Sequence, residues 1–243
     1  MLLEARAVSR AFGSFMALSN AELVVAEGEI IGLIGPNGAG KSTFFNCLVG
    51  DLAPTSGRVI FAGADVTDAS PEAHARLGIG RTFQVPATFE EMTILENVMV
   101  GAFLRHPNRN DARAKAREIV EFVGLGSQID QPARSLGTPG RKRLEIARVL
   151  ASEPRLILLD EALAGLTPVE IQAAIELVRR IHRRGVTLVI VEHIMEVILS
   201  LTQRVLVFNQ GHTIASGSPS DIVNDPAVIE AYLGRRRERR RRA

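Results

Sequence analysis

The sequence contains a single cysteine, Cys47. One cysteine excludes an internal disulfide bond and a cysteine metal cluster. Because its neighbours Phe44, Phe45 and Leu48 are apolar, we expect Cys47 to be an inert core residue. The five histidines are scattered without the spacing of metal ligands, so the sequence indicates no metal site built from the protein alone.

The sequence also lacks a long hydrophobic run and a secretory leader. No apolar stretch approaches the roughly 18 residues that span a bilayer. Residues 1–6 do not have the basic-then-apolar layout of a signal peptide. With 243 residues, 46% of them hydrophobic, the chain suits one large domain or two intimate lobes. We therefore expect a cytoplasmic protein whose membrane association, at the inner face of the cell membrane, runs through partners.

Positive charge is concentrated at the C-terminus. The formal net charge is +2, but residues 235–242 hold seven arginines and one glutamate, so the rest of the chain carries −4. A terminal block of like charge is typically solvated and disordered, which is what we expect of residues 235–243. Contact with anionic lipid headgroups is the alternative. Since no aromatic residue interleaves the arginines, we expect no nucleic-acid partner.

Residues 35–43 match the phosphate-binding pattern G-x-x-x-x-G-K-[ST]. An apolar run at 30–34 predicts a buried strand before it, and 42–49 predicts a helix after it. Glycines let the backbone curl so that its N–H groups face phosphate oxygens, Lys41 would reach the β- and γ-phosphates, and Ser42 would bind Mg²⁺. The predicted nucleotide-binding residues are Gly35, Pro36, Asn37, Gly38, Ala39, Gly40, Lys41, Ser42 and Thr43.

Hydrophobic patterning predicts an α/β protein with a helical insert. Strands are expected at 21–25, 57–66, 155–159 and 186–191, with a late hairpin formed by 204–208 and 212–216. Helices are expected at 111–123, from about 167 to 185, and at 226–233. The nucleotide-binding lobe would comprise about 1–86 and 151–234, with a mixed sheet, and the helical lobe about 87–150.

Two further segments carry candidate chemistry. The apolar run at 156–159 ends in Asp160 and Glu161, a Walker B pattern in which Asp160 would hold Mg²⁺ and Glu161 would act as general base toward the attacking water. His193 follows a second apolar strand at 187–191. We interpret it as a phosphate sensor, and a purely structural histidine is the alternative.

The order of these motifs resembles an ATP-binding cassette (ABC) ATPase over essentially the full chain, and the branch of branched-chain amino acid importers in particular. The residues that carry the resemblance are the P-loop, 81–84 (RTFQ), 91–97 (EMTILEN), 143–148 (RLEIAR), 164–166 (AGL) and the ending 225–234. The ending is more specific than the P-loop, since it separates this branch from other cassettes.

The resemblance implies further roles. Phe12 would stack on adenine, with a core strand phenylalanine as the alternative. Gln84 would bind Mg²⁺ and the attacking water, and the loop at 85–92 would face the coupling helix of a membrane subunit. ATP and Mg²⁺ are the implied cofactors, and a solute-binding protein would take part only indirectly.

One family segment departs from its pattern. Where cassettes have Leu-Ser-Gly-Gly-Gln, this chain has Leu136-Gly137-Thr138-Pro139-Gly140, and Pro139 lacks an N–H. Thr167 also stands where many cassettes have aspartate. Because this segment serves the opposite protomer's site, we expect a heterodimer with a different ATPase subunit. A homodimer that hydrolyses ATP at both sites is the alternative.

The expected function is therefore ATP binding and hydrolysis in an ABC importer for branched-chain amino acids or a related small solute, acting through separate membrane subunits. The alternatives are the ATPase of a lipid or lipopolysaccharide export system and a soluble ABC ATPase not tied to transport. The sequence itself does not identify the solute.

Overall fold

The computed structural model describes residues 1–232, and the arginine-rich tail predicted to be disordered lies outside them. The chain forms two compact units, Met1–Pro71 with the segment from Thr187 onward, and Glu72–Val186. The second unit thus includes strands and helices on both sides of the predicted helical insert. The expected lobe boundaries near residues 87 and 150 follow the family pattern and stay a prediction.

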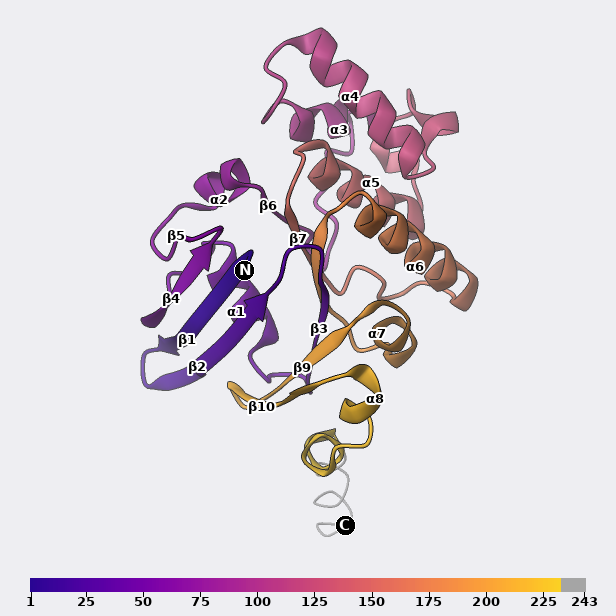
Figure 1. Ribbon diagram of the computed structural model, residues 1–243. Helices are drawn as coiled ribbons and strands as arrows, with labels where there is room; N and C mark the ends of the chain where they lie inside the picture. Colours follow the sequence, from indigo (N-terminus) through magenta and orange to yellow (C-terminus); the bar gives the residue numbers. More distant parts are fainter. Residues whose placement is uncertain (233–243) are drawn as a thin grey trace. The chain divides into compact units, whose positions relative to one another are not determined.

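The first unit contains a four-stranded antiparallel sheet in the order β2-β1-β4-β5. These strands lie side by side in Figure 1. Their bounds are β1 Leu3–Phe12, β2 Phe15–Val25, β4 Ser56–Phe61 and β5 Ala64–Asp65. The β4–β5 hairpin confirms the arm predicted at 57–66, whereas β1 has no counterpart among the predicted strands.

A second set of strands in this unit runs in the order β10-β9-β3-β8. Strand β3 pairs in parallel with both β8 and β9, and β10 returns antiparallel to β9. Every residue of β3 and β8 is buried, as expected of strands covered on both faces. The bounds are β3 Ile30–Ile34, β8 Thr187–Val191, β9 Arg204–Asn209 and β10 His212–Gly217, which confirms the predicted strands and the late hairpin.

Short helices complete the first unit and connect its C-terminal end to its core. They are α1 Lys41–Leu48, α7 Met195–Leu201 and α8 Pro219–Ile222, and residues 226–232 are also helical. Ile222 of α8 and Val228 pack in one buried cluster with Ile34, the last residue of β3. The C-terminal segment therefore packs on the strand that leads into the P-loop.

The second unit is mainly helical. Strands β6 and β7 pair in parallel within it. Its elements are α2 Pro71–Leu77, β6 Ile79–Arg81, α3 Ile94–Ala102, α4 Arg109–Phe122, α5 Thr138–Ala151, β7 Leu156–Asp160 and α6 Pro168–Arg183, with 3₁₀ turns at Gly126–Gln128 and Ala133–Ser135. The predicted helices at 111–123 and 167–185 and the strand at 155–159 are confirmed to within a few residues.

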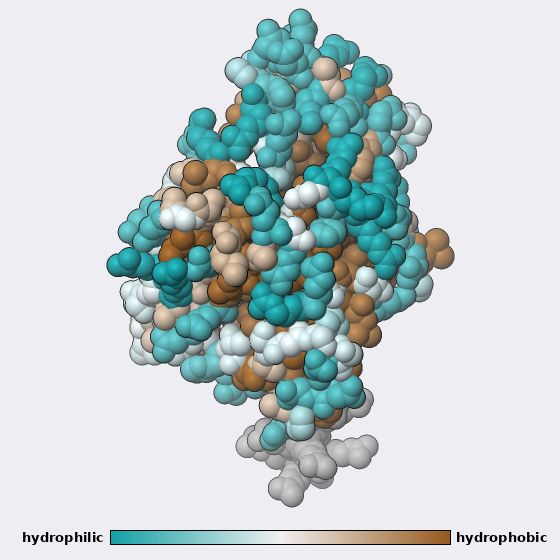
Figure 2. Space-filling model, in the orientation of Figure 1, coloured by the Kyte–Doolittle hydropathy of each residue, from teal (hydrophilic) through white to brown (hydrophobic). Residues whose placement is uncertain are grey.

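Local sequence explains where these helices begin and which face they bury. Helix α3 starts with a capping box, in which Thr93 Oγ1 accepts the N–H of Glu96 and Glu96 Oε2 accepts the N–H of Thr93. Helix α6 buries Ile171, Ile175 and Val178 on one stripe. Hydrophilic residues predominate over α4 in Figure 2, which fits the single buried face of that helix.

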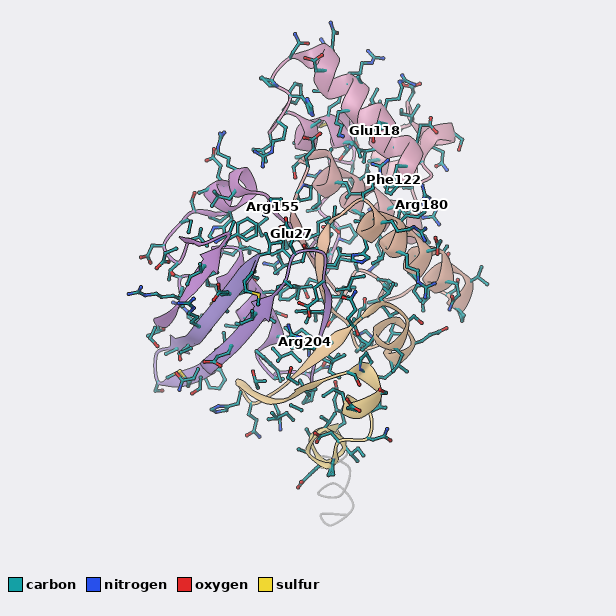
Figure 3. All side chains as sticks on the ribbon, viewed as in Figure 1. Glu27, Glu118, Phe122, Arg155, Arg180 and Arg204 are labelled. Atoms are coloured by element: carbon teal, nitrogen blue, oxygen red, sulfur yellow. The ribbon has the colours of Figure 1, made fainter. Side chains whose placement is uncertain are left out.

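Helices α4 and α6 are joined by a phenylalanine held between two arginines. The guanidinium carbons of Arg180 and Arg184 lie 4.4 and 3.8 Å from the centroid of the Phe122 ring. Arg180 also donates to the Phe122 carbonyl at 2.8 Å, and Arg184 pairs with Glu118 at 3.0 Å. Figure 3 labels Glu118, Phe122 and Arg180 at this junction. We call Phe122, Arg180 and Arg184 the Phe122 clamp.

The burial of the single cysteine agrees with the expectation from the sequence. Cys47 is 1% exposed, and this burial raises the pKa of its thiol to about 11, which confirms the inert core cysteine. Within residues 1–232, no helix is both long and apolar enough to cross a membrane.

Candidate functional site

The P-loop lies in the first unit between β3 and α1, and its glycines are required by close backbone contacts. Gly35 has φ 154°, and a Cβ there would lie 2.2 Å from the Phe208 carbonyl oxygen. Gly40 has φ 100°, and its Cβ would lie 2.8 Å from the Ala17 carbonyl oxygen. Any larger residue at either position would displace the backbone, so the curl of the loop depends on glycine.

Lys41 is the first residue of α1 and is held against the loop. Its Nζ donates to the carbonyl oxygens of Gly35 at 2.7 Å and Pro36 at 3.2 Å, and the residue is only 8% exposed. Ser42 is exposed, and no described side chain caps the start of α1. The first N–H groups of the helix and the Lys41 ammonium are therefore suited to an anionic ligand such as a phosphate.

Phe12 and His193 are the other predicted site residues in the first unit. Phe12 ends β1 and is 45% exposed, with the Arg10 guanidinium 4.8 Å from its ring centroid. That exposure argues against the core-phenylalanine alternative, and the adenine contact stays a prediction. His193 is exposed and follows β8 by one residue, Glu192, which is buried.

Asp160, Glu161 and Gln84 belong to the second unit. Asp160 is the last residue of β7 and is 5% exposed, and Arg81 Nη2 donates to its Oδ2 at 3.0 Å. Arg81 belongs to the family motif at 81–84, but the motif indicated no role for it. In the structure Arg81 ends β6, the parallel neighbour of β7, so that its side chain and that of Asp160 emerge at the same end.

The structure brings Gln84 and Glu161 into direct contact. Gln84 Nε2 donates to Glu161 Oε2 at 2.8 Å, across 77 residues of sequence. Glu161 has φ 47°, in the left-handed region that costs a non-glycine residue about 1–3 kcal/mol. Lys142 Nζ donates to the Glu161 carbonyl oxygen at 3.2 Å and so holds this strained backbone. The two residues predicted to handle the attacking water thus share one hydrogen bond.

Sequence reasoning missed Glu145 on α5. Its Oε1 accepts the backbone N–H of Phe83 at 2.8 Å, and the residue is 6% exposed. Burial raises the pKa of this carboxyl to about 7, against the lowering effect of the Phe83 N–H and of Arg148 and Lys142 nearby. The only signal was an acidic residue among Leu144, Ile146 and Ala147 on a buried helix.

The predicted metal ligands supply the donor types that Mg²⁺ prefers. Ser42 offers a hydroxyl and Asp160 a carboxylate, both oxygen donors. Gln84 uses its amide nitrogen toward Glu161, so its amide oxygen is the atom that a cation would take. In the described part of the chain no group of three histidine, cysteine or acidic side chains could hold a metal on its own. These donors fit a cation that arrives with a nucleotide.

The segment 136–140 opens α5, which begins at Thr138 with Gly137 as its N-cap. Pro139 lies in the first turn, where helix N–H groups are otherwise available to a ligand. The fixed φ of proline suits this position, so the helix tolerates it, but one donor is lost. Thr167 caps α6, with its N–H donated to Glu170 Oε2 at 2.8 Å, which gives it a structural role.

Comparison with known proteins agrees with these features. The family described as "ABC transporter" matches residues 18–164, and "Branched-chain amino acid ATP-binding cassette transporter" matches 212–238. The chain is 36% identical to the high-affinity branched-chain amino acid transport ATP-binding protein LivG of Escherichia coli K12, covering 96% of this chain and 98% of LivG. It is 33% identical to the lipopolysaccharide export system ATP-binding protein LptB of Acidithiobacillus ferridurans, covering 96% and 97%.

A solved structure shows the same fold. The crystal structure of the ADP conformation of MJ1267, an ATP-binding cassette of an ABC transporter, superimposes with a TM-score of 0.87 at 32% identity, covering 96% of this chain and 98% of that one. The mixed sheets, the P-loop between strand and helix, and the helices at 94–151 therefore belong to a known α/β P-loop NTPase arrangement.

Proposed function

Because the chain belongs to the ABC transporter family of ATPases, we propose that it binds and hydrolyses ATP to drive import of branched-chain amino acids, or of a related small solute, through separate membrane subunits. The observation that carries the solute class is the match of residues 212–238 to the branched-chain amino acid ATP-binding cassette transporter family. The similarity to LptB keeps lipopolysaccharide export as the competing function.

The chain's own residues suggest how hydrolysis proceeds. N–H groups of residues 38–43 would orient the phosphates, and the Lys41 ammonium would neutralise their charge. Mg²⁺, held by Ser42, Gln84 and Asp160, would supply positive charge at the β- and γ-phosphate oxygens. Gln84 would orient the attacking water, and Glu161 would take its proton. His193 would contact the γ-phosphate, and Phe12 would stack on adenine.

Glu161→Gln tests this assignment. The glutamine can still accept the Gln84 hydrogen bond but cannot take a proton, so ATP binding should persist while turnover falls by about 10²–10⁴-fold. Binding of a fluorescent ATP analogue and release of phosphate measure the two properties separately. Unchanged turnover in the variant would refute Glu161 as the base.

The solute is tested by reconstitution with membrane subunits of the branched-chain amino acid importer type. Co-reconstituted in vesicles with their binding protein, the wild-type complex should accumulate radiolabelled leucine on addition of ATP, and the Glu161→Gln complex should not. ATP-driven release of lipopolysaccharide from the same vesicles, without leucine uptake, would instead establish the export function.

We infer that the membrane subunits contact the loop at 85–92, together with the neighbouring Phe83. A cavity of about 180 Å³ lies in the second unit beside this segment. Phe83, Val85 and Phe89 are 48%, 78% and 45% exposed, an unusual concentration of apolar surface on a short loop. The cavity lining combines this apolar loop with charged groups, namely Arg81, Phe83, Ala87, Val100, Gly101, Glu145, Arg148 and Val149.

We also propose that the chain works beside a different ATPase subunit. In this family each site takes its P-loop from one protomer and the 136–140 segment from the other. The chain keeps all of the residues assigned to its own nucleotide site. The segment 136–140, which contributes to the other protomer's site, lacks the backbone N–H donor at Pro139. A missing donor aimed at a transferring phosphate costs about 2.7–4 kcal/mol of barrier. One competent and one weak site would result, and a symmetric homodimer is the alternative.

A further inference from the structure

The segment 83–89, which follows the β6 strand and includes Gln84, is held by side chains from two helices. From α5, Glu145 accepts the backbone N–H of Phe83 at 2.8 Å, and Arg148 donates to the Ala87 carbonyl oxygen. The Arg148 guanidinium also lies 4.7 Å from the Phe89 ring centroid. From α3, the buried Asn97 accepts the Phe89 N–H at 2.9 Å and donates back to its carbonyl at 2.9 Å.

The same face of α5 contacts the other catalytic segment. Lys142, one helical turn before Glu145, donates to the Glu161 carbonyl oxygen at 3.2 Å. Helix α5 therefore holds the backbone on both sides of the 2.8 Å hydrogen bond between Gln84 and Glu161. Glu145 and Lys142 act on backbone atoms, so neither touches the reacting groups themselves.

We propose that Glu145 is a positioning residue, which by accepting the Phe83 N–H fixes the start of the segment 83–89 and with it the place of the neighbouring Gln84 amide against Glu161. This inference rests on the proposed ATPase function for its effect on turnover. Its effect on the segment itself is independent of hydrolysis. A displacement of about 1 Å at such a site can lower a rate 100-fold, which is why a residue outside the reacting shell matters.

The surroundings of Glu145 suit this role. Two cations of α5, Lys142 and Arg148, lie near the carboxylate. The carboxyl is 6% exposed, so water does not replace its contacts with the loop. The part-buried Phe83 N–H would lose its acceptor if the carboxylate were removed, and backbone groups that are shielded from water are rarely left unpaired.

Three substitutions separate the elements of the proposal. Glu145→Leu removes the acceptor, Glu145→Gln keeps an acceptor oxygen at the same reach without charge, and Glu145→Asp keeps the charge but shortens the reach. Glu118→Leu is the matched control, because Glu118 is an ion-paired glutamate of the same unit whose partners are Lys115 and Arg184 on helices away from the loop. Circular dichroism establishes that each variant is folded.

The first readout is amide hydrogen exchange of residues 83–89 in the isolated chain. We expect exchange about tenfold faster in Glu145→Leu and Glu145→Asp, with wild-type protection in Glu145→Gln and Glu118→Leu. Wild-type protection in both Leu and Asp variants overturns the proposal, as does equal loss in all three Glu145 variants. Should Glu145→Leu not fold, the comparison of Asp with Gln alone decides the outcome.

The second readout is the steady-state ATPase rate. We expect kcat to fall about tenfold in Glu145→Leu and Glu145→Asp with KM for ATP within twofold of wild type, and Glu145→Gln to restore most of the rate. Loss of protection with unchanged kcat overturns the link to Gln84. Absence of ATPase activity in the wild type would refute the proposed function instead, while the exchange data would still decide whether Glu145 holds the loop.

Discussion

Individual residues of this protein are held in conformations that their own preferences oppose. Glu161 adopts φ 47° and Ala7 adopts φ 49°, both in the left-handed region that residues with a Cβ disfavour. Such conformations persist only when surrounding contacts over-determine them. For Glu161 the contacts are Gln84 on the side chain and Lys142 on the backbone. The strain thus falls on the residue proposed to take the proton.

Gly40→Ala should separate steric conflict from simple backbone preference. Its Cβ would meet Ala17 at 2.8 Å, whereas Gly28, with φ +74°, has nothing within 4 Å and serves as the control. We expect Gly28→Ala to cost about 1–2 kcal/mol in free energy of unfolding, and Gly40→Ala to cost more and also weaken ATP binding. Urea unfolding and nucleotide titration measure both. Equal costs for the two variants would contradict the steric argument.

The buried Glu145 carboxyl predicts a pH dependence of stability. Burial raises its pKa from 4.5 to about 7, so between these values the folded state binds more protons than the unfolded state. Stability relative to Glu145→Gln should therefore fall as pH rises from about 4.5 to about 7, by at most about 1.4 kcal/mol per pH unit. Urea unfolding of both proteins at pH 5, 6, 7 and 8 tests this, and a constant difference would contradict it.

At the scale of elements, the second unit is stabilised by contacts between helices far apart in sequence. Helix α4 meets α6 through the Phe122 clamp, and α3 approaches α5 so closely that a Cβ on Gly101 would lie 2.0 Å from the Arg148 carbonyl oxygen. Both contacts need particular residues. A guanidinium stacks on an aromatic ring, and only glycine admits the α3–α5 approach.

Phe122→Leu should destabilise the second unit by about 1–2 kcal/mol, because it removes two cation–π contacts worth about 0.5–1 kcal/mol each while keeping an apolar side chain. Phe15→Leu is the control, since Phe15 is 65% exposed at the start of β2. A double-mutant cycle of Phe122→Leu with Arg184→Gln isolates the interaction, and a coupling energy near zero would show that the clamp contributes only packing.

The helices and strands also show which elements can be predicted from the sequence and which cannot. Strands β3 and β8 are unbroken apolar runs, and α6 has a clear helical stripe, so all three were predicted. Strand β1 was missed because its pairing with β2 shifts register after Ala5 and Val8, and Ala7 has φ 49°. Such bulges break the two-residue alternation on which strand prediction depends. Strand β6, with three residues, is too short for any period.

The residues of the candidate site likewise fall into those that the sequence predicts and those that only the fold reveals. Motif spacing is enough to predict roles for the P-loop, Asp160 and Glu161, because each motif is defined by a few neighbouring residues. Contacts such as Arg81 with Asp160 and Gln84 with Glu161 join residues 79 and 77 positions apart. Only the fold brings these together, so their hydrogen bonds could not be read from local pattern. Glu145 belongs to the family motif at 143–148, but nothing in that motif indicated a contact with Phe83.

At the scale of the whole molecule, the question is how the chain assembles. Pro139 at the start of α5 lacks the N–H that the family presents to the opposite nucleotide. A protein that binds ATP well but presents a weakened 136–140 segment to the opposite nucleotide should not form an ATP-dependent homodimer. Its assembly would then require a second, different cassette subunit.

Light scattering on Glu161→Gln with ATP and Mg²⁺ tests this directly. We expect a monomer that binds ATP, and a dimer when the substitutions Gly137→Ser, Thr138→Gly and Pro139→Gly are added to restore the first four residues of the family pattern. The same triple variant without ATP is the control. An ATP-dependent dimer of Glu161→Gln alone would favour the symmetric homodimer.

The solitary, buried Cys47 has a practical consequence for following this protein in motion. With its thiol pKa near 11 and 1% exposure, Cys47 contributes almost no reactive thiolate at neutral pH. A cysteine introduced at the exposed Val85 can thus be labelled with a fluorophore or spin label in an otherwise native chain. Because Cys47 would take up almost no label, time-resolved spectroscopy could follow the loop that contains Val85 without a background signal from the native chain.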